Sequence, residues 1–539
     1  MAVVTVDGKD IEIGATERLN CIEVARRAGV EIPHYCWHPG LSVVASCRMC
    51  LIETGTRDPA TGKVTMMPKL VPGCQTPAKD GTVIVTESAL VKESRARVEE
   101  ALLIDHPIDC PICDKAGECL LQDYHFEHGQ AERRADIHAF HSRRRDVGPT
   151  VTLFVDRCIM CTRCVRFARE VSGTSELMVI NRGAKEEIDV FPGFPLDNKL
   201  SGNVVDLCPV GALGDKDFLY QQRVWFLKRE ANVCGGCATG CSILTEHNQD
   251  SVYRLKPREN PHVNKWWMCD DGRYGWHHLH DSSRLLAAEH RSAAGATRQT
   301  IEWPAVVTRL RDDIKAAGSL AVAVSPMLTL EEAWMLCAVA RSIDPHAFLA
   351  VGHVPTRGAD ESFPGGFTIR AEKCPNRLGV EAVLSLFDQP LHSWNDLVEH
   401  VRAGRATAAW ITAGHPEPWI DATTAAPFAD LKCLVVQDLF DSPLAQLATW
   451  RLPAAGFAER AGTWVNAGHR AQSFEQAIRA PAGVWPEGRL FWNMLGRRGL
   501  YDPVAVRQQI AESSATLAAL AGEMPATGVD LRLQQLAGA

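Results

Sequence analysis

Cysteine is the residue type in this sequence whose number and spacing could do chemistry. The chain has 19 cysteines in 539 residues, and 16 of them precede residue 270. Many fall in tight Cys-x2-Cys repeats, which are more often metal ligands than disulfides when a protein lacks an export signal. The opening residues, MAVVTVDGKDIEI, lack the layout of a signal peptide and predict strand, turn and strand. The cysteines therefore predict metal centres.

The first set is Cys36, Cys47, Cys50 and Cys74, and its spacing is that of a plant-type ferredoxin with a wider first gap. Two iron atoms bridged by two sulfides need four thiolates, two on each iron. A helix is expected over about residues 17–28, and the strand–helix–strand opening favours a [2Fe–2S] cluster in a β-grasp domain. The long last gap holds TRDPATGKVTMM, which predicts a hairpin insertion. The alternative is a zinc site with four cysteine ligands.

The second set is one ligand short, because Cys110, Cys113 and Cys119 leave one corner of a [4Fe–4S] cubane open. His106 lies about one turn upstream of these cysteines. Pro107 predicts that the helix expected over residues 88–106 stops there and turns the imidazole toward the loop. His125 and His128 compete for the same position, so spacing alone leaves the choice open.

The third set is Cys158, Cys161, Cys164 and Cys208, the last followed by proline. Three thiolates at three-residue spacing wrap three corners of a cubane, and the remote Cys-Pro closes the fourth, as in half of the bacterial ferredoxin run. Zinc prefers two separated pairs of ligands, so this pattern favours [4Fe–4S] over zinc.

The fourth set is Cys234, Cys237, Cys241 and Cys269, again with a three-cysteine loop and a remote fourth ligand. Glycines in its loop allow the backbone to approach inorganic sulfur and to tune the reduction potential. We expect a third [4Fe–4S] cluster there. The cysteines outside the four sets are expected to be core residues: Cys21, Cys337, Cys374 and Cys433.

Composition excludes several classes of function. The net charge of −8 gives no basic footprint for nucleic acid. No apolar run reaches the roughly 18–20 residues of a membrane-spanning helix. A dinucleotide-binding G-x-G-x-x-G and a Walker A motif are both missing, so we expect no NADH or flavin site on this chain.

The second half of the chain alternates strands with helices, which is typical of a parallel α/β sheet. Helices are expected over 330–343 and 393–402. Strands are expected over 320–325, 380–387, 408–414 and 433–438. A basic stretch over 138–145 is interpreted as a solvated face, with a docking surface as the alternative.

The order of the motifs resembles that of the large peripheral-arm iron–sulfur subunit, the G-type subunit, of respiratory complex I (NADH:quinone oxidoreductase). The segments that carry the resemblance are SCRMCLIETG (46–55), HPIDCPICDKAGECLLQD (106–123), DRCIMCTRCVRFARE (156–170) and DLCPVGAL (206–213). The resemblance implies that His106 is a cluster ligand. It also matches the fourth set to an additional cluster found in some bacterial members.

Beyond residue 280 the resemblance is weaker. RLPAAGFAERAGTWVNAGHRAQ (451–472) looks like a stretch of the molybdopterin-oxidoreductase-like domain that follows in this family. The family carries no molybdenum in that domain, and we expect none here. The expected fold is multidomain, α+β followed by α/β. Its five parts are a [2Fe–2S] β-grasp domain (1–80), a histidine-ligated [4Fe–4S] domain (81–145), a ferredoxin-like [4Fe–4S] domain (146–225), a Mo/W-type [4Fe–4S] domain (226–285) and a truncated molybdopterin-oxidoreductase-like α/β domain (286–539).

The resemblance implies an electron-transfer subunit of an oxidoreductase with one [2Fe–2S] and three [4Fe–4S] clusters. It would accept electrons from a flavin- and NADH-binding partner and pass them toward quinone-proximal iron–sulfur subunits. Its expected place is the cytoplasmic face of the bacterial inner membrane, reached only through partner subunits. The alternative is the cluster-bearing subunit of a soluble NAD-linked formate dehydrogenase or hydrogenase complex.

Overall fold

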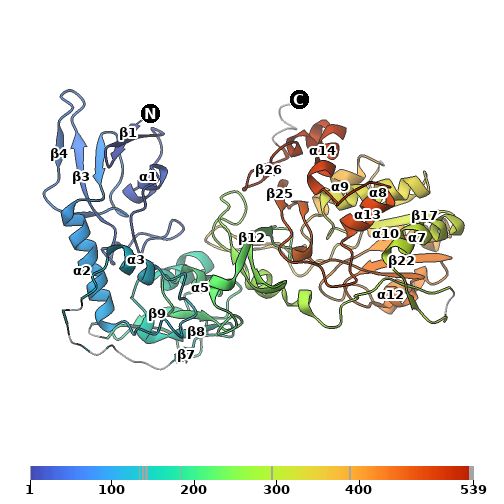
Figure 1. The fold of residues 1–539 in the computed structure, drawn as a ribbon, viewed down its shortest axis with the longest axis horizontal. Helices are drawn as coiled ribbons and strands as arrows, with labels where there is room; N and C mark the ends of the chain where they lie inside the picture. Colours follow the sequence, from blue (N-terminus) through green and yellow to red (C-terminus); the bar gives the residue numbers. More distant parts are fainter. Residues whose placement is uncertain are drawn as a thin grey trace. The chain divides into compact units, whose positions relative to one another are not determined.

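The chain forms two compact units, which Figure 1 colours along the sequence. The computed structural model describes residues 2–132, 134–135, 137, 139, 144–183, 185–292, 295–387 and 390–532. The first unit comprises Met1–Leu227 and Phe363–Gly366, and the second comprises Lys228–Ser362 and Phe367–Ala539. This division is coarser than the five domains expected from the sequence, which stay a prediction.

A mixed sheet opens the first unit. Strands β1 (Ala2–Val6) and β2 (Lys9–Ile13) form the expected hairpin, and β1 pairs in parallel with β6 (Thr82–Val85). Strand β3 (Leu51–Arg57) runs antiparallel to β6 and to β4 (Val64–Met66), which confirms the predicted hairpin insertion. The short strand β5 pairs with the start of β3, over Val71–Pro72.

Two helices frame the second cysteine set. Helix α1 (Cys21–Arg27) lies within the range predicted for the first helix and begins at a capping box between Asn20 and Glu23. Helix α2 (Ala89–Asp105) ends where Pro107 predicts, with His106 in extended backbone conformation. Helix α3 (Leu120–His128) follows the cysteine loop.

The rest of the first unit is built around a three-stranded sheet. Its strands are β7 (Arg144–Asp146), β8 (Val151–Phe154) and β11 (Leu213–Asp215). Helices α4 (Arg163–Phe167) and α5 (Asn203–Leu207) carry cysteines of the third set at or beside their ends. A second hairpin pairs β9 with β10, over Leu177–Ile180 and Glu187–Val190.

The basic stretch over 138–145 lies largely outside the described residues, which include its residue 139 and its last two arginines. Arg145 binds Glu187 at 2.6 Å and Asp189 at 2.7 Å. Arg144 donates to Thr152 at 2.8 Å and stacks over Phe154. These two arginines therefore hold β7 onto its neighbours within the unit.

The second unit begins with an antiparallel sheet of β12 (Lys228–Val233), β13 (Ser242–Asn248) and β14 (Ser251–Pro257). The fourth cysteine set lies in the turn between β12 and β13 and at the start of helix α6 (Asp270–Tyr274).

A seven-stranded sheet forms the body of the second unit, in the order β16-β15-β23-β22-β21-β17-β18. The pairs from β23 to β18 are parallel, as the alternating pattern predicts. Its strands are β15 (Glu289–His290), β16 (Gln299–Thr300), β17 (Leu320–Val324), β18 (Phe348–Val351), β21 (Ala408–Thr412), β22 (Cys433–Asp438) and β23 (Trp450–Pro453).

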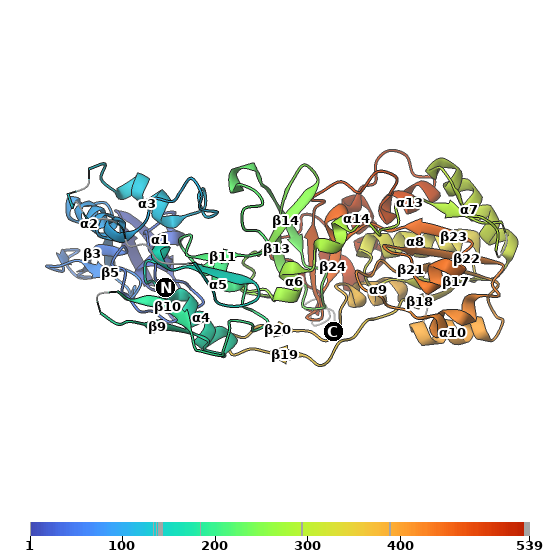
Figure 2. The same ribbon diagram turned by 90° about the horizontal axis from the view of Figure 1, so that it is seen from below.

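Helices cover both faces of this sheet (Figure 2). One face packs against α7 (Trp303–Ala317), α8 (Leu330–Ile343), α9 (Arg377–Leu384), α13 (Glu487–Met494) and α14 (Pro503–Ser513). The other face packs against α10 (Trp394–Arg402), α11 (Ala422–Ala425) and α12 (Pro443–Leu447). Alternate residues of β17 face opposite layers, because Val322 belongs to the first core and Ala321 to the second.

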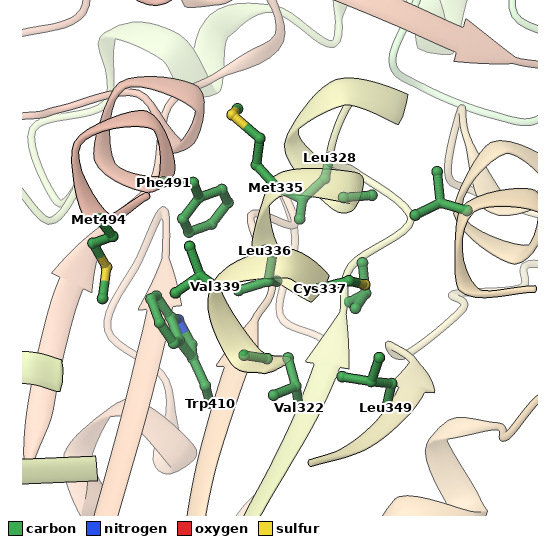
Figure 3. Close-up of a cluster of buried hydrophobic side chains, with 14 of the residues drawn as sticks. Val322, Leu328, Met335, Leu336, Cys337, Val339, Leu349, Trp410, Phe491 and Met494 are labelled. Carbon is green, nitrogen blue, oxygen red and sulfur yellow. The ribbon is translucent and has the colours of Figure 1, made fainter. Parts of the chain in front are cut away.

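Figure 3 shows the first of these cores, where α8 places Met335, Leu336 and Val339 beside Trp410 and Phe491. Helices α8 and α10 and strands β17, β21 and β22 confirm the predicted elements.

The predicted strand over 380–387 is wrong, since that segment lies mostly in helix α9. Its buried residues Val380, Val383 and Leu384 follow helical spacing and pack into the core beside α8. A short apolar run fits a strand or a helix equally well by periodicity, and tertiary packing decides.

Among the described residues, no helix combines the length and the apolarity that crossing a bilayer requires.

Candidate metal centres

The first set forms two pairs of thiols. Cys36, Cys50 and Cys74 are at most 1% exposed, and all four cysteines are free of disulfides. A hydrogen bond from the Cys47 thiol lowers the pKa of Cys36 to about 5 and raises the pKa of Cys47. A bond between Cys50 and Cys74 likewise raises the pKa of Cys50. The structure thus presents one pair from the first two cysteines and one from the last two, the grouping that two irons need.

Left-handed backbone turns curl the loop around these thiols. Ala45 and Arg48 flank Ser46 and Cys47 and have φ of 51° and 62°. Such turns point successive N–H groups to one side and create a concave surface that favours negative charge.

The second set lines one cavity, in which His106 lies with Cys110, Cys113 and Cys119. Neither of the competing histidines lines that cavity. The Nδ1 atom of His106 is buried and has no hydrogen-bond partner among the described residues. Burial and the nearby Arg157 lower the pKa of His106, so its imidazole is neutral at neutral pH and can donate a lone pair to a metal.

One glycine joins the second cavity to the third set. Gly211 lies in the loop that follows Cys208, and a Cβ atom there would be 2.2 Å from the Sγ of Cys113. The same loop accepts a hydrogen bond from Leu120 N at the Pro209 carbonyl, at 2.9 Å. The segment that closes the third set is therefore also a wall of the second.

The third set also surrounds one cavity, which is walled by apolar side chains and by Cys158, Cys161, Cys164 and Cys208. Met160 and Thr162 between the cysteines are left-handed, with φ of 51° and 57°, and Met160 N lies 3.4 Å from the Cys158 Sγ. Burial raises the pKa of Cys158 to about 12 and of Cys161 to about 11.

The fourth set lines a larger cavity of about 530 Å³ together with basic and aromatic side chains. Gly236 N approaches the Cys234 Sγ, and Gly272 N approaches the Cys269 Sγ, each at 3.4 Å. Burial raises the pKa of Cys234 to about 12, and the nearby Lys373 opposes that rise.

Amide side chains from the α/β part anchor the loop of the fourth set. Asn466 Nδ2 donates to the Thr239 carbonyl at 2.9 Å, and Gln472 Nε2 donates to the Gly240 carbonyl at 2.8 Å. Gln472 Oε1 in turn accepts from Ser242 Oγ at 2.7 Å. Both amides belong to the stretch over 451–472, so that stretch positions the fourth set.

The donor chemistry fits iron–sulfur clusters. A buried neutral thiol is a poor ligand, and the raised pKa values show that apolar surroundings disfavour the thiolate. Positively charged iron reverses that preference, since metal binding releases the thiol proton. Within the described part of the chain, no three His, Cys, Asp or Glu side chains are grouped closely enough to hold a single ion.

The cysteines outside the four sets lie in the core. Cys21 and Cys374 are fully buried, Cys337 and Cys433 belong to the core of the large sheet, and burial raises the pKa of Cys21 to about 12. Gly211 and Gln472 were missed in the sequence because their partners lie far away along the chain.

Four protein-family models match successive parts of the chain. They describe a 2Fe-2S iron-sulfur cluster binding domain (residues 2–89), an NADH-ubiquinone oxidoreductase-G iron-sulfur binding region (95–134), an NADH-quinone oxidoreductase subunit 3 ferredoxin-like domain (148–214) and a molybdopterin oxidoreductase (275–486). The fourth cysteine set lies between the last two ranges. The fold therefore contains a [2Fe–2S] ferredoxin domain, [4Fe–4S] binding regions and a molybdopterin-oxidoreductase-like domain.

Curated relatives carry the same assignment. The G subunit of NADH-quinone oxidoreductase from Rickettsia bellii is 37% identical over 281 residues, which are 51% of this chain and 39% of that protein. The corresponding G subunit from Streptomyces coelicolor is 32% identical over 385 residues, 67% of this chain and 43% of that protein. NADH dehydrogenase [ubiquinone] iron-sulfur protein 1 of Solanum tuberosum is 37% identical over 333 residues, 60% and 43% of the two chains.

The chain spans less than half the length of these relatives. A chain of a solved NAD+-reducing [NiFe]-hydrogenase in the H2-reduced state is 27% identical, with a TM-score of 0.33, covering 41% of this chain and 91% of that one. The resemblance drawn from the cysteine motifs is confirmed by the family models and the curated relatives: the chain is a homologue of the G-type iron–sulfur subunits of NADH-quinone oxidoreductase.

Proposed function

We propose that this chain is an iron–sulfur electron-transfer subunit of an NADH:quinone oxidoreductase. The observation that carries the proposal is that the second, third and fourth sets each line one cavity with all four of their candidate ligands. The matched relatives, each a subunit of an NADH-quinone or NADH-ubiquinone oxidoreductase by name, support the same assignment.

The four sets would hold one [2Fe–2S] and three [4Fe–4S] clusters, which accept and release single electrons. The ligands of the [2Fe–2S] cluster would be Cys36, Cys47, Cys50 and Cys74. Those of the [4Fe–4S] clusters would be His106 with Cys110, Cys113 and Cys119, then Cys158, Cys161, Cys164 and Cys208, then Cys234, Cys237, Cys241 and Cys269. The protein fixes their spacing, excludes water from the thiols and directs N–H groups at sulfur.

In this proposal the first three sets form the route for electrons, and the fourth stabilises the fold. The anchoring of the fourth set by Asn466 and Gln472 supports a structural role. We assign no molybdenum to the chain: among the described residues, the only thiols lining the cavity of the fourth set are its own four.

The partners would be a flavin- and NADH-binding subunit as donor and quinone-proximal iron–sulfur subunits as acceptors. The chain would then lie at the cytoplasmic face of a bacterial inner membrane, held there by those partners. The second candidate is a subunit of an NAD-linked formate dehydrogenase or hydrogenase, which the names of the curated relatives favour less.

The test is anaerobic iron and sulfide analysis of the purified chain with an EPR-monitored redox titration. The proposal predicts about 14 iron atoms per chain and four distinguishable clusters. Zinc without sulfide would defeat it. Co-purification with a molybdenum- or nickel-containing enzyme, in place of a quinone-reducing complex, would establish the second candidate.

A further inference from the structure

Two buried arginines on α4 connect the first cysteine set to the third. Arg163 and Arg166 are 6% and 2% exposed. The Nη2 atom of Arg166 donates to the Cys36 carbonyl at 2.5 Å and to the Cys161 carbonyl at 3.1 Å. One nitrogen atom therefore bonds to the main chain of a candidate ligand from each set.

Arg163 makes a second bridge beside the first. Its Nη2 donates to the Trp37 carbonyl at 2.5 Å, and its Nη1 donates to the Leu207 carbonyl at 3.3 Å. Trp37 directly follows Cys36, and Leu207 directly precedes Cys208. Each bridge thus ends at a ligand, or next to one, in both sets.

The acceptors of both arginines are main-chain carbonyls, and neither Nε has a hydrogen-bond partner among the described residues. Leaving a charge buried without an opposite charge costs several kcal/mol. The neighbouring His34 and His38 add no positive charge at neutral pH, since burial and the arginines lower their pKa to about 4 and about 3. The two guanidinium charges therefore call for a nearby negative group.

Loaded cysteine sets supply that group. A cluster held by four thiolates is negative overall, because its thiolates and sulfides exceed the charge of its iron. Arg163 and Arg166 lie where such charges on the first and third sets would neutralise them from both sides. In this buried position the attraction is screened little by salt.

We propose that Arg163 and Arg166 are positioning residues that raise and couple the reduction potentials of the first-set and third-set clusters. The inference rests on the proposed function. Reduction of either cluster adds one electron and one negative charge, with no bond made or broken and no proton required. A guanidinium shared by both sites favours that added charge at each of them.

The test compares Arg166→Gln, which removes the charge, with Arg166→Lys, which keeps it. The matched control is Arg169→Gln, because Arg169 lies three residues farther along, has a 62% exposed side chain and pairs with Glu170. Midpoint potentials of both clusters are measured by EPR-monitored titration of the full chain at full iron and sulfide content. We expect R166Q to lower both potentials, R166K to keep both near the wild-type values and R169Q to change neither.

A fully loaded R166Q chain with unchanged potentials, or with only one of the two lowered, would overturn the inference. If R166Q fails to bind iron, Arg163→Gln decides instead: lowered potentials of both clusters support the inference, and unchanged potentials reject it. A wild-type chain that holds no clusters under anaerobic conditions would reject the proposed function itself, which separates the two failures.

Discussion

The second and fourth cysteine sets share a ligand chemistry but have different walls. The cavity of the second set is closed by Gly211, which comes from the loop that also closes the third set. The loop of the fourth set is instead held by Asn466 and Gln472 of the α/β part of its own unit. Sets that share walls and bridging arginines are suited to exchanging electrons, whereas a set anchored to a sheet is suited to stabilising it.

Gly211→Ala should have the largest effect, because its Cβ would lie 2.2 Å from Cys113 Sγ. We expect the variant to lose the second cluster, which is about four iron atoms per chain by iron analysis. Gly235→Ala is the control in the fourth set, where the Cβ would meet Phe457 at an ordinary 3.4 Å. Equal iron contents in the two variants would contradict the difference in walls.

Glu99 should make the stability of the first unit depend on pH. It is fully buried beside Tyr35, whose hydroxyl donates to it, and burial raises the pKa of Glu99 from 4.5 to about 7. Folding therefore favours its protonated form. The resulting stabilisation, on the order of 3 kcal/mol, is complete below about pH 4.5 and is lost as the pH rises through about 7.

Glu99→Gln should flatten the pH dependence of the first unit's thermal midpoint between pH 5 and 8. The second unit should keep its own dependence, since burial raises the pKa of Glu331 and Glu487 to about 7 as well. The exposed Glu93 on the same helix provides the control variant, Glu93→Gln. A steep slope that persists in E99Q would mean that another group of the first unit is responsible.

Gln472→Ala should destabilise the second unit by about 2 kcal/mol, because Ser242 and the Gly240 carbonyl lose a buried partner. Denaturant unfolding measures the loss, and EPR should show a changed fourth cluster beside unchanged signals from the first unit. Gln476→Ala removes an exposed amide with one hydrogen bond and should cost little. A change in the signals of the first three clusters would break the comparison.

His106→Cys should have the smallest effect on the fold. The second set should keep a [4Fe–4S] cluster, with a lower midpoint potential because a thiolate donates more electron density than an imidazole. His128→Gln, outside the cavity, is the control. An unchanged potential and EPR signal in H106C would show that His106 is not a ligand.

The sequence predicts elements best where local signals agree. Helix α8 has the predicted bounds, Leu330–Ile343, and the structure adds a capping box between Thr329 and Glu332. The segment over 380–387 failed because its apolar residues satisfy both periods, and packing beside α8 selected the helix.

The grouping of the cysteines could be predicted from spacing, but their surroundings could not. Arg166 reaches Cys36 across 130 residues, and Gln472 reaches Gly240 across 232. No periodicity encodes such pairs, because the fold brings them together. The one local signal is that Arg163 and Arg166 stand at helical spacing in the apolar run after Cys161, where a charge needs a partner.

The shared wall at Gly211 also has a consequence for maturation. Until the loop after Cys208 is in place, the pocket around Cys113 lacks one side, so insertion of the second cluster depends on closure of the third. Cys208→Ala should therefore lose about eight iron atoms rather than four. Loss of only four would show that the two clusters are inserted independently.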